Sequence, residues 1–359
     1  AVRRGRQSSI PRSREFFIDL KAYANRSFAD WTGQGDNNFA AMPLGVQEVG
    51  KLRFSIIDPA ANQNKSCLIL RGSAKPEFPA KITDIKVDRK LARIFFLHTG
   101  AWSGNDAGRY RMHYSDGTYS DYLLVSNYNI GDWWQTGYLT DAVPGIIRAN
   151  AVTEKVGTFV AEWENPYPQK TISAIDFISA GGTGDIDYMP GRYPVSILIA
   201  ATGELASDDI SPLSGKWSGG AKGDAVAPTV SVQDGYAKIK FPEVGENGYN
   251  YAMLRFDMSK FDPAKHKYLT FFARSATGGT LDACLPEAEW KSRYRGVFDL
   301  DSRFTDWRKV RLSLEDDMQG SVMKDKKLRG EFFLYHGENK KVPGGAKAIE
   351  SDIRYLSFE

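Results

Sequence analysis

Short runs in which hydrophobic and polar residues alternate, or in which several apolar residues follow one another, recur along the whole chain. Clusters of Gly, Pro, Asn and Asp separate these runs, and helical spacing of apolar residues is scarce. Such runs are typical of β-strands, and the turn residues between them favour antiparallel connections. Clear examples are "KLRFSII", "ARIFFLHT", "TFVAEW", "VSILIAA", "YAMLRFDM" and "KYLTFFARS".

Two Asp-Gly pairs predict hairpin turns. Asp116-Gly117 lies between "RYRMHYS" and "YSDYLLV", and an Asp-Gly pair readily adopts the backbone of a two-residue turn. This turn would place His113 and Tyr119 near one another. Asp234-Gly235 predicts a second hairpin within "TVSVQDGYAKIKFP".

The strand rhythm is interrupted once, by "ELASDDISPLSGKWSGGAKGDAVAPT", which has the Ser, Gly, Ala, Asp and Pro content of a linker. With 359 residues, the chain is also longer than a typical domain of about 100 to 200 residues. We therefore expect an all-β chain of two tandem antiparallel β-sandwiches. The expected parts are a flexible basic N-terminal tail at 1–14, a first sandwich at 15–203, a linker or crossing segment at 204–228, and a second sandwich at 229–359.

Composition narrows the possible functions. Aromatic residues make up 13% of the chain, beside 34 Gly and 16 Pro, which suits sandwiches because aromatic rings pack well on pleated sheets. The formal net charge is only +3, and no basic stripe with interleaved aromatic residues occurs, so nucleic acid is not an expected partner. The two cysteines, Cys67 and Cys284, predict neither a disulfide framework nor a zinc site.

The sequence contains no apolar run near the ~20 residues of a membrane span. The Arg-rich N-terminus has no initiator Met and no apolar signal-peptide core, so we expect the chain to have been processed or to be part of a longer protein.

Known enzyme motifs are missing from the sequence. No GxSxG, HExxH or phosphate-binding glycine loop occurs, and no strand carries the closely spaced carboxylates of sandwich-fold glycosidases. A His with a Tyr and an Arg could remove the proton next to a uronic acid carboxylate. His98, His113 and Tyr114 are the candidates for such a reaction, and the alternative is that they are ordinary strand residues.

The stretch "FADWTGQGDNN" (28–38) is too polar for a strand and too specific for a spacer. Asp30, Asp36 and Asn38 offer the hard oxygen ligands that Ca²⁺ prefers. The same residues also suit a hydrogen-bonded turn. The sequence leaves both readings open, so a structural calcium ion is a possible cofactor.

Tryptophans gather in three Gly-, Asn- and Asp-rich stretches of the first half: "DWTGQGDNN", "GAWSGNDAGRY" and "NIGDWWQTGY". A sugar site needs a flat ring for the apolar face of the sugar and polar groups for its hydroxyls. Because neighbouring residues of an extended chain point in opposite directions, one of the paired tryptophans is expected to point inward. The candidate ligand-binding residues are Trp31, Trp102, Arg109, Tyr119, Trp133 and Trp134.

Four segments in a fixed order carry a family resemblance: "DWTGQGDNN", "ARIFFLHTGAW", the "YSDG" hairpin leading to "DWW", and "WENPYP". Over residues 15 to 203 the chain resembles the galactose-binding-like β-sandwich modules that are appended to bacterial glycosidases. The resemblance implies jelly-roll sandwiches that bind carbohydrate or serve as spacers, often with a structural calcium and without catalysis. It also implies a secreted or cell-surface protein.

The second half resembles other jelly-roll carbohydrate-binding modules in its pattern of sheet-forming strands, such as "YAMLRFDM" and "KYLTFFARS". Its candidate surface aromatics are Trp217, Trp290, Tyr294 and Trp307.

Three functional hypotheses follow. The first is a non-catalytic carbohydrate-binding protein whose partner is a polysaccharide or glycan and which belongs to a larger glycoside-degrading chain. The second is a structural subunit of a surface layer, appendage or extracellular assembly, in which the basic tail is exchanged between subunits. The third is a polysaccharide lyase or hydrolase with an unfamiliar site.

Overall fold

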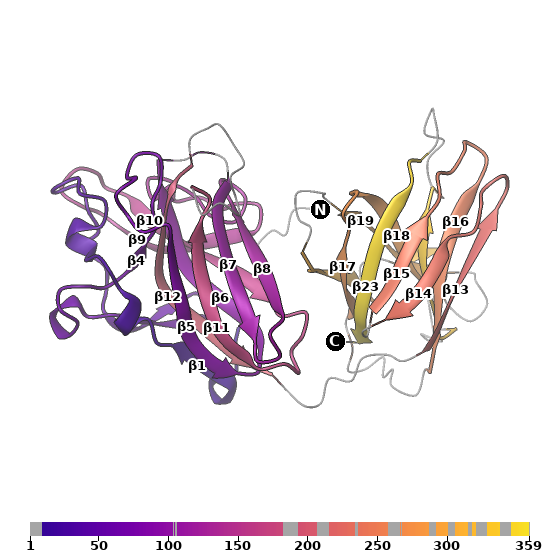
Figure 1. Ribbon diagram of the computed structural model, residues 1–359, viewed down its shortest axis with the longest axis horizontal. Helices are drawn as coiled ribbons and strands as arrows, with labels where there is room; N and C mark the ends of the chain where they lie inside the picture. The colour runs from indigo at the N-terminus through magenta and orange to yellow at the C-terminus, as the bar shows by residue number, and fades with distance from the viewer. Residues whose placement is uncertain are drawn as a thin grey trace. The chain divides into compact units, whose positions relative to one another are not determined.

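The computed structural model describes residues 9–102, 104, 106–181, 193–206, 215–233, 236–257, 266, 268–286, 292–300, 306–314, 318–320, 329–337 and 346–358. The chain forms two compact units, Ala1–Ser207 and Asp208–Glu359 (Figure 1). Within the described residues, both are built from antiparallel strands, without an α-helix. No described helix is long and apolar enough to cross a membrane. The expected fold class, all-β with two tandem antiparallel jelly-roll sandwiches, is confirmed.

The first unit contains a six-stranded sheet of order β1-β12-β6-β10-β9, in which β4 also pairs with β12. Its strands are β1 Glu15–Ile18, β4 Leu68–Ile69, β6 Leu91–Ala101, β9 Ala142–Arg148, β10 Val156–Glu164 and β12 Val195–Leu205. The central strands β6 and β12 are buried along nearly their whole length. Strands that are covered on both faces are apolar throughout, which explains the runs "IFFL" and "VSILIAA".

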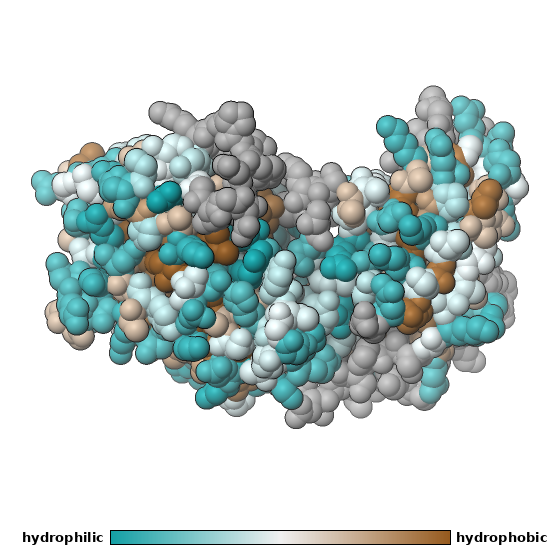
Figure 2. All heavy atoms as spheres, viewed as in Figure 1, coloured by the Kyte–Doolittle hydropathy of each residue, from teal (hydrophilic) through white to brown (hydrophobic). Residues whose placement is uncertain are grey.

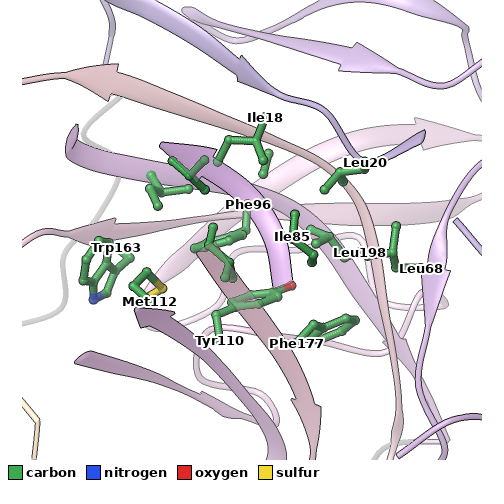
Figure 3. Close-up of a cluster of buried hydrophobic side chains, with 14 of the residues drawn as sticks. Ile18, Leu20, Leu68, Ile85, Phe96, Tyr110, Met112, Trp163, Phe177 and Leu198 are labelled. Atoms are coloured by element: carbon green, nitrogen blue, oxygen red, sulfur yellow. The ribbon is translucent and has the colours of Figure 1, made fainter. Parts of the chain in front are cut away.

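A four-stranded sheet of order β5-β11-β7-β8 packs against one face of this sheet. Its strands are β5 Lys81–Arg89, β7 Asp106–Tyr114, β8 Tyr119–Val125 and β11 Ile172–Ser179. Tyr110 and Met112 of β7 and Phe177 of β11 point into the space shared with Phe96 and Leu198 of the larger sheet (Figure 3). The rings of Phe96 and Tyr110 stack with their centroids 3.9 Å apart. This apolar layer is the core of the first sandwich.

The opposite face of the six-stranded sheet is covered by the N-terminal part of the chain, drawn in indigo in Figure 1. This part contains the hairpin β2 Gly45–Val49 and β3 Leu52–Ile56 and the 3-10 helices η1 Arg12–Arg14, η2 Lys21–Tyr23, η3 Phe28–Asp30 and η4 Pro59–Ala61. Phe39 and Phe54 from the covering segment share an apolar cluster with Phe95 and Ile197 of the sheet. The first unit therefore has three layers, and its solvent-facing sheet surface is the outer face of β5-β11-β7-β8.

The second unit pairs a six-stranded sheet of order β13-β16-β22-β18-β19-β21 with a five-stranded sheet of order β14-β15-β23-β17-β20. The strands of the first are β13 Gly215–Lys222, β16 Tyr249–Phe256, β18 Gly279–Pro286, β19 Ser292–Leu300, β21 Met318–Gly320 and β22 Glu331–His336. Those of the second are β14 Thr229–Gln233, β15 Tyr236–Phe241, β17 Tyr268–Arg274, β20 Arg308–Ser313 and β23 Ile349–Phe358. Phe271 and Phe332 meet between the sheets, with ring centroids 5.2 Å apart.

The segment expected to be a linker at 204–228 contains a strand. β13 pairs with β16 over its whole length, and Trp217 packs against the core of the second unit. The small residues that suggested a linker are needed for close packing, since a Cβ at Gly220 would lie 2.4 Å from Cζ of Tyr251. The linker prediction is therefore wrong for the residues of β13.

The tail expected at 1–14 is fixed to the first sandwich over its described part. Ile10 is buried, and Nε and Nη2 of Arg14 donate to the carbonyl oxygen of Leu205 at 2.9 and 2.6 Å. Nη1 of Arg14 also lies 3.2 Å from Glu204. Flexibility is therefore the wrong prediction for residues 9–14, whereas residues 1–8 lie outside the described part of the chain.

The first hairpin prediction is confirmed. β7 and β8 pair through a loop at 115–118 in which Gly117 has a φ of 85°, and His113 lies opposite Tyr119. The loop is longer than the predicted two residues. Asp234-Gly235 lies outside the described residues, but the strands on either side pair, with Gln233 opposite Tyr236.

Candidate functional site

The loop 28–38 belongs to the layer that covers the six-stranded sheet. Trp31 is fully buried, and its ring centroid lies 5.2 Å from that of Phe39 and 4.9 Å from that of Trp133. Trp133 is buried as well. The prediction that these two rings contact a ligand is wrong, because the second face of the sheet requires an apolar cover and the two indoles supply it.

The residues predicted to hold calcium make contacts within the loop or next to it. Oδ2 of Asp30 lies 3.2 Å from Nη1 of Arg26, and Oδ1 of Asn38 accepts a hydrogen bond from the backbone N of Ala40 at 2.9 Å. Asp36 is exposed. Across the described residues, no three His, Cys, Asp or Glu side chains gather as a metal group would require. The contacts are those of a hydrogen-bonded turn, and calcium binding at the loop stays a prediction.

Trp102 and Trp134 lie at one end of the first sandwich. The backbone N of Trp133 donates to the carbonyl oxygen of Gly100 at 2.8 Å, which holds the loop after β8 against the end of β6. Trp134 is 48% exposed, and Trp102 is half-buried with a left-handed φ of 58°. Of the two adjacent tryptophans, Trp133 points inward and Trp134 outward, as the sequence predicted. Ligand contact by Trp102 and Trp134 stays a prediction.

The three residues considered for lyase chemistry do not form one site. His98 is fully buried on β6, with Nε2 2.9 Å from the carbonyl oxygen of Asn129, and burial lowers the pKa of His98 to about 4. Tyr114 points into the sandwich, where its hydroxyl donates to Oδ1 of Asn165 at 2.7 Å. His113 alone points to the outer face. His98 therefore lies inside the sandwich core, where its Nδ1 is 3.1 Å from the hydroxyl of Tyr110, whereas His113 lies on the outer face.

On the outer face of the β5-β11-β7-β8 sheet, the aromatic ring of Tyr119 contacts a cluster of charged side chains. Nε and Nη2 of Arg111 donate to the two carboxylate oxygens of Asp121 at 2.8 and 2.9 Å, and these bonds raise the pKa of Arg111 above its usual value. Nη1 of Arg109 lies 3.4 Å from the same carboxylate. The guanidinium carbon of Arg111 lies 4.0 Å from the ring centroid of Tyr119, which is 54% exposed. Arg109 and Tyr119 thus belong to one outward-facing cluster.

An open hollow of about 530 Å³ adjoins this cluster at His113. Nε2 of His113 lies 2.8 Å from Oδ2 of Asp176 on the neighbouring strand β11. The hollow is lined by Lys81, Thr83, Asp84, Lys86, His113, Tyr114, Ser173, Ala174 and Asp176. Ammonium, hydroxyl, imidazole and carboxylate groups converge there, which is the chemistry needed to bind a ligand rich in hydroxyl groups.

A β-bulge shapes the wall of the hollow on β5. Between Ile82 and Ile85 the register with β11 shifts by one residue, and Asp84 takes a left-handed φ of 57°. The backbone N of Asp84 donates to Oδ1 of Asp176 at 2.9 Å. The hydroxyl of Tyr23 donates to the carbonyl oxygen of Asp84 at 2.7 Å and accepts from the backbone N of Lys86 at 3.1 Å. The bulge is therefore fixed from two sides.

The sequence predicted that His113 and Tyr119 are neighbours, but it did not predict that Asp176 contacts His113. The Asp-Gly turn indicated that His113 and Tyr119 are neighbours, whereas Asp176 lies 63 residues further along the chain than His113. Lys86 of "KITDIKVDR" could have been assigned to the solvent-facing surface because it lies between Ile85 and Val87, but strict alternation places Lys81 on the other face. Nothing in that pattern shows the bulge, because the contact with Tyr23 is tertiary.

The aromatic candidates of the second unit are largely inside it. Tyr294 and Trp307 are buried, and Trp217 is half-buried against the core. Trp290 lies outside the described residues. The best-defined solvent-facing site is therefore the one in the first unit.

Comparison with known proteins gives neither a matching family model nor a matching curated protein. Among solved structures, the chain is similar to a family 11 carbohydrate-binding module from Clostridium thermocellum in complex with a beta-1,3-1,4-mixed-linked tetrasaccharide. The identity is 10% and the TM-score 0.31, over 42% of this chain and 92% of that one. It is also similar to the N-terminal tandem of two family 22 modules from Paenibacillus barcinonensis Xyn10C, with 10% identity and a TM-score of 0.26 over 99% of both chains. Because these values are low, we base the function on the site.

Proposed function

We propose that the chain is a non-catalytic carbohydrate-binding protein and that the outer face of the β5-β11-β7-β8 sheet receives the saccharide. The observation that carries this proposal is the open hollow of about 530 Å³ beside the exposed ring of Tyr119. A sugar ring has apolar C–H faces and a polar edge of hydroxyl groups. A flat aromatic ring next to convergent polar groups is complementary to both.

The groups at the site have distinct roles in the proposal. Tyr119 stacks on the sugar with the ring face that Arg111 does not cover, and the guanidinium holds the ring in place. His113 and Asp176, which line the hollow, form hydrogen bonds with sugar hydroxyls. Binding alone is proposed, since the other two residues considered for catalysis, His98 and Tyr114, point into the sandwich. The proposed location, secreted or at the cell surface, follows from the family resemblance.

The structural-subunit hypothesis gains no support from the N-terminus. It required an arm that leaves its own sandwich and joins a neighbour, but from residue 9 onward the segment contacts its own unit through Ile10 and Arg14. We therefore retain carbohydrate binding as the single proposed function.

Affinity electrophoresis against a panel of neutral and acidic polysaccharides tests the proposal. Tyr119→Ala is the site variant, and Tyr138→Ala is the matched control because Tyr138 is also an exposed tyrosine of the first unit, 73% accessible in a loop. We expect at least one polysaccharide to retard the wild type, about fivefold weaker binding by Tyr119→Ala, and no change in the control. Absence of retardation, or equal effects of the two variants, would contradict the proposal.

A further inference from the structure

Two lysines of β5, Lys81 and Lys86, border the hollow although they lie five positions apart. In a regular strand, Lys81 and Lys86 would point to opposite faces because side chains alternate. The bulge between Ile82 and Ile85 adds one residue to β5 relative to β11, which shifts the alternation of its side chains by one position. Both lysines therefore line the hollow, while Ile85 remains in the core. Bulges commonly redirect side chains at functional sites.

Both lysines are exposed, and within the described part of the chain neither forms an ion pair. The carboxylate of Asp176 in the hollow is already engaged, since it contacts His113 and the backbone N of Asp84. Asp84 has its own exposed carboxylate on the bulge. A ligand can therefore contact the two ammonium groups without displacing an existing partner.

The four strands of the outer sheet carry five lysine and arginine side chains and five carboxylates. Arg109 and Arg111 share the single carboxylate of Asp121. The basic side chains are Lys81, Lys86, Arg89, Arg109 and Arg111, and the carboxylates are Asp84, Asp88, Asp106, Asp121 and Asp176. The charges therefore balance over the sheet, and the attraction for an anionic ligand is local to the two unpaired lysines.

The hollow therefore has a more specific chemistry than a neutral sugar requires. We propose that it binds saccharides carrying an anionic group, a carboxylate or a sulfate ester, and that this group contacts the ammonium groups of Lys81 and Lys86. The inference rests on the proposed function and specifies its ligand class. Lysine is a compact charge on a flexible stem, so the pair can adapt to a planar carboxylate or a tetrahedral sulfate, and the hydroxyl groups of Thr83 and Ser173 complete the polar lining.

Titration with matched polymers tests this inference. Polygalacturonate is compared with its methyl ester, and dextran sulfate with dextran, so that each pair differs in charge on the same backbone. Lys81→Gln, Lys86→Gln and the double variant are compared with Lys155→Gln, which removes an exposed lysine before β10. We expect the wild type to prefer the charged member of at least one pair. Each site variant should bind the charged polymer about two- to fivefold more weakly than the wild type, and Lys155→Gln should bind it as the wild type does.

The two polymer pairs identify the anionic group. Preference for polygalacturonate over its methyl ester indicates a carboxylate, and preference for dextran sulfate over dextran indicates a sulfate ester. Added salt should weaken this binding, because exposed charges are screened. Equal binding of charged and uncharged members, or equal effects of the site and control variants, would overturn the inference while leaving the proposed function intact. Failure to bind any polymer would count against both.

Discussion

Nε2 of His113 lies 2.8 Å from Oδ2 of Asp176, a contact that joins β7 to β11 on the outer face of the first sandwich. The second carboxylate oxygen of Asp176 accepts a hydrogen bond from the backbone N of Asp84. One aspartate thus fixes both the imidazole and the bulge of β5. The shape of the hollow depends on this residue.

Replacing Asp176 should therefore disturb binding more than folding. Asp176→Ala removes a partner from His113 and from the bulge, and we expect about tenfold weaker saccharide binding with about 1–2 kcal/mol lower unfolding free energy. Calorimetric titration and urea denaturation measure the two effects. The control is Asp88→Asn, which removes an exposed carboxylate of the same strand and keeps a residue type that tolerates its left-handed φ of 49°. An affinity equal to that of the wild type would show that Asp176 does not shape the site.

The buried His98 makes stability depend on pH. Burial lowers its pKa to about 4, compared with 6.5 for an unperturbed histidine. Between these values the unfolded chain binds a proton that the native chain does not. The unfolding free energy should therefore fall as pH decreases from about 6.5 to about 4, by about 3 kcal/mol from this residue alone.

Urea denaturation at several pH values, with His98→Gln as the reference variant, isolates this contribution from that of the carboxylates. We expect the difference in unfolding free energy between the two proteins to shift in favour of the variant at low pH. A constant difference across this range would mean that His98 titrates normally in the native chain.

Two tryptophans that look equivalent in the sequence should respond differently to replacement. Trp31→Ala opens a cavity among Phe39 and Trp133 and should cost about 3–5 kcal/mol of unfolding free energy. Trp134→Ala removes a ring that is 48% exposed and should cost less than about 1 kcal/mol. Thermal denaturation compares the two. Equal losses would contradict the assignment of Trp31 to the covering layer.

The strands were predictable because their alternation follows directly from burial of one face. The part "IKVD" of β5 alternates between buried and exposed positions as the outer sheet does, and Asp116-Gly117 correctly predicted that His113 meets Tyr119. A turn motif is local, so four or five residues suffice to recognise it. This part of the candidate site needed no tertiary information.

The remainder of the site depends on contacts that are distant in sequence. Trp31 and Trp134 both occur in polar, glycine-containing loops, and only the third layer of the first unit determines that one is buried and the other exposed. The bulge that brings Lys81 and Lys86 to one side is held by Tyr23 and Asp176, from two other parts of the chain. A local sequence pattern cannot predict contacts with residues that are distant in the chain.

The central claim is that a saccharide binds on the outer sheet face and not at the loop end of the sandwich. The most direct measurement is calorimetric titration of the double variant Tyr119→Ala, His113→Ala, with Trp102→Ala, Trp134→Ala as the matched control, using the polysaccharide that retards the wild type most. We predict at least tenfold weaker binding by the first double variant and wild-type affinity for the second. Wild-type affinity in the first, or loss of binding only in the second, would contradict the account.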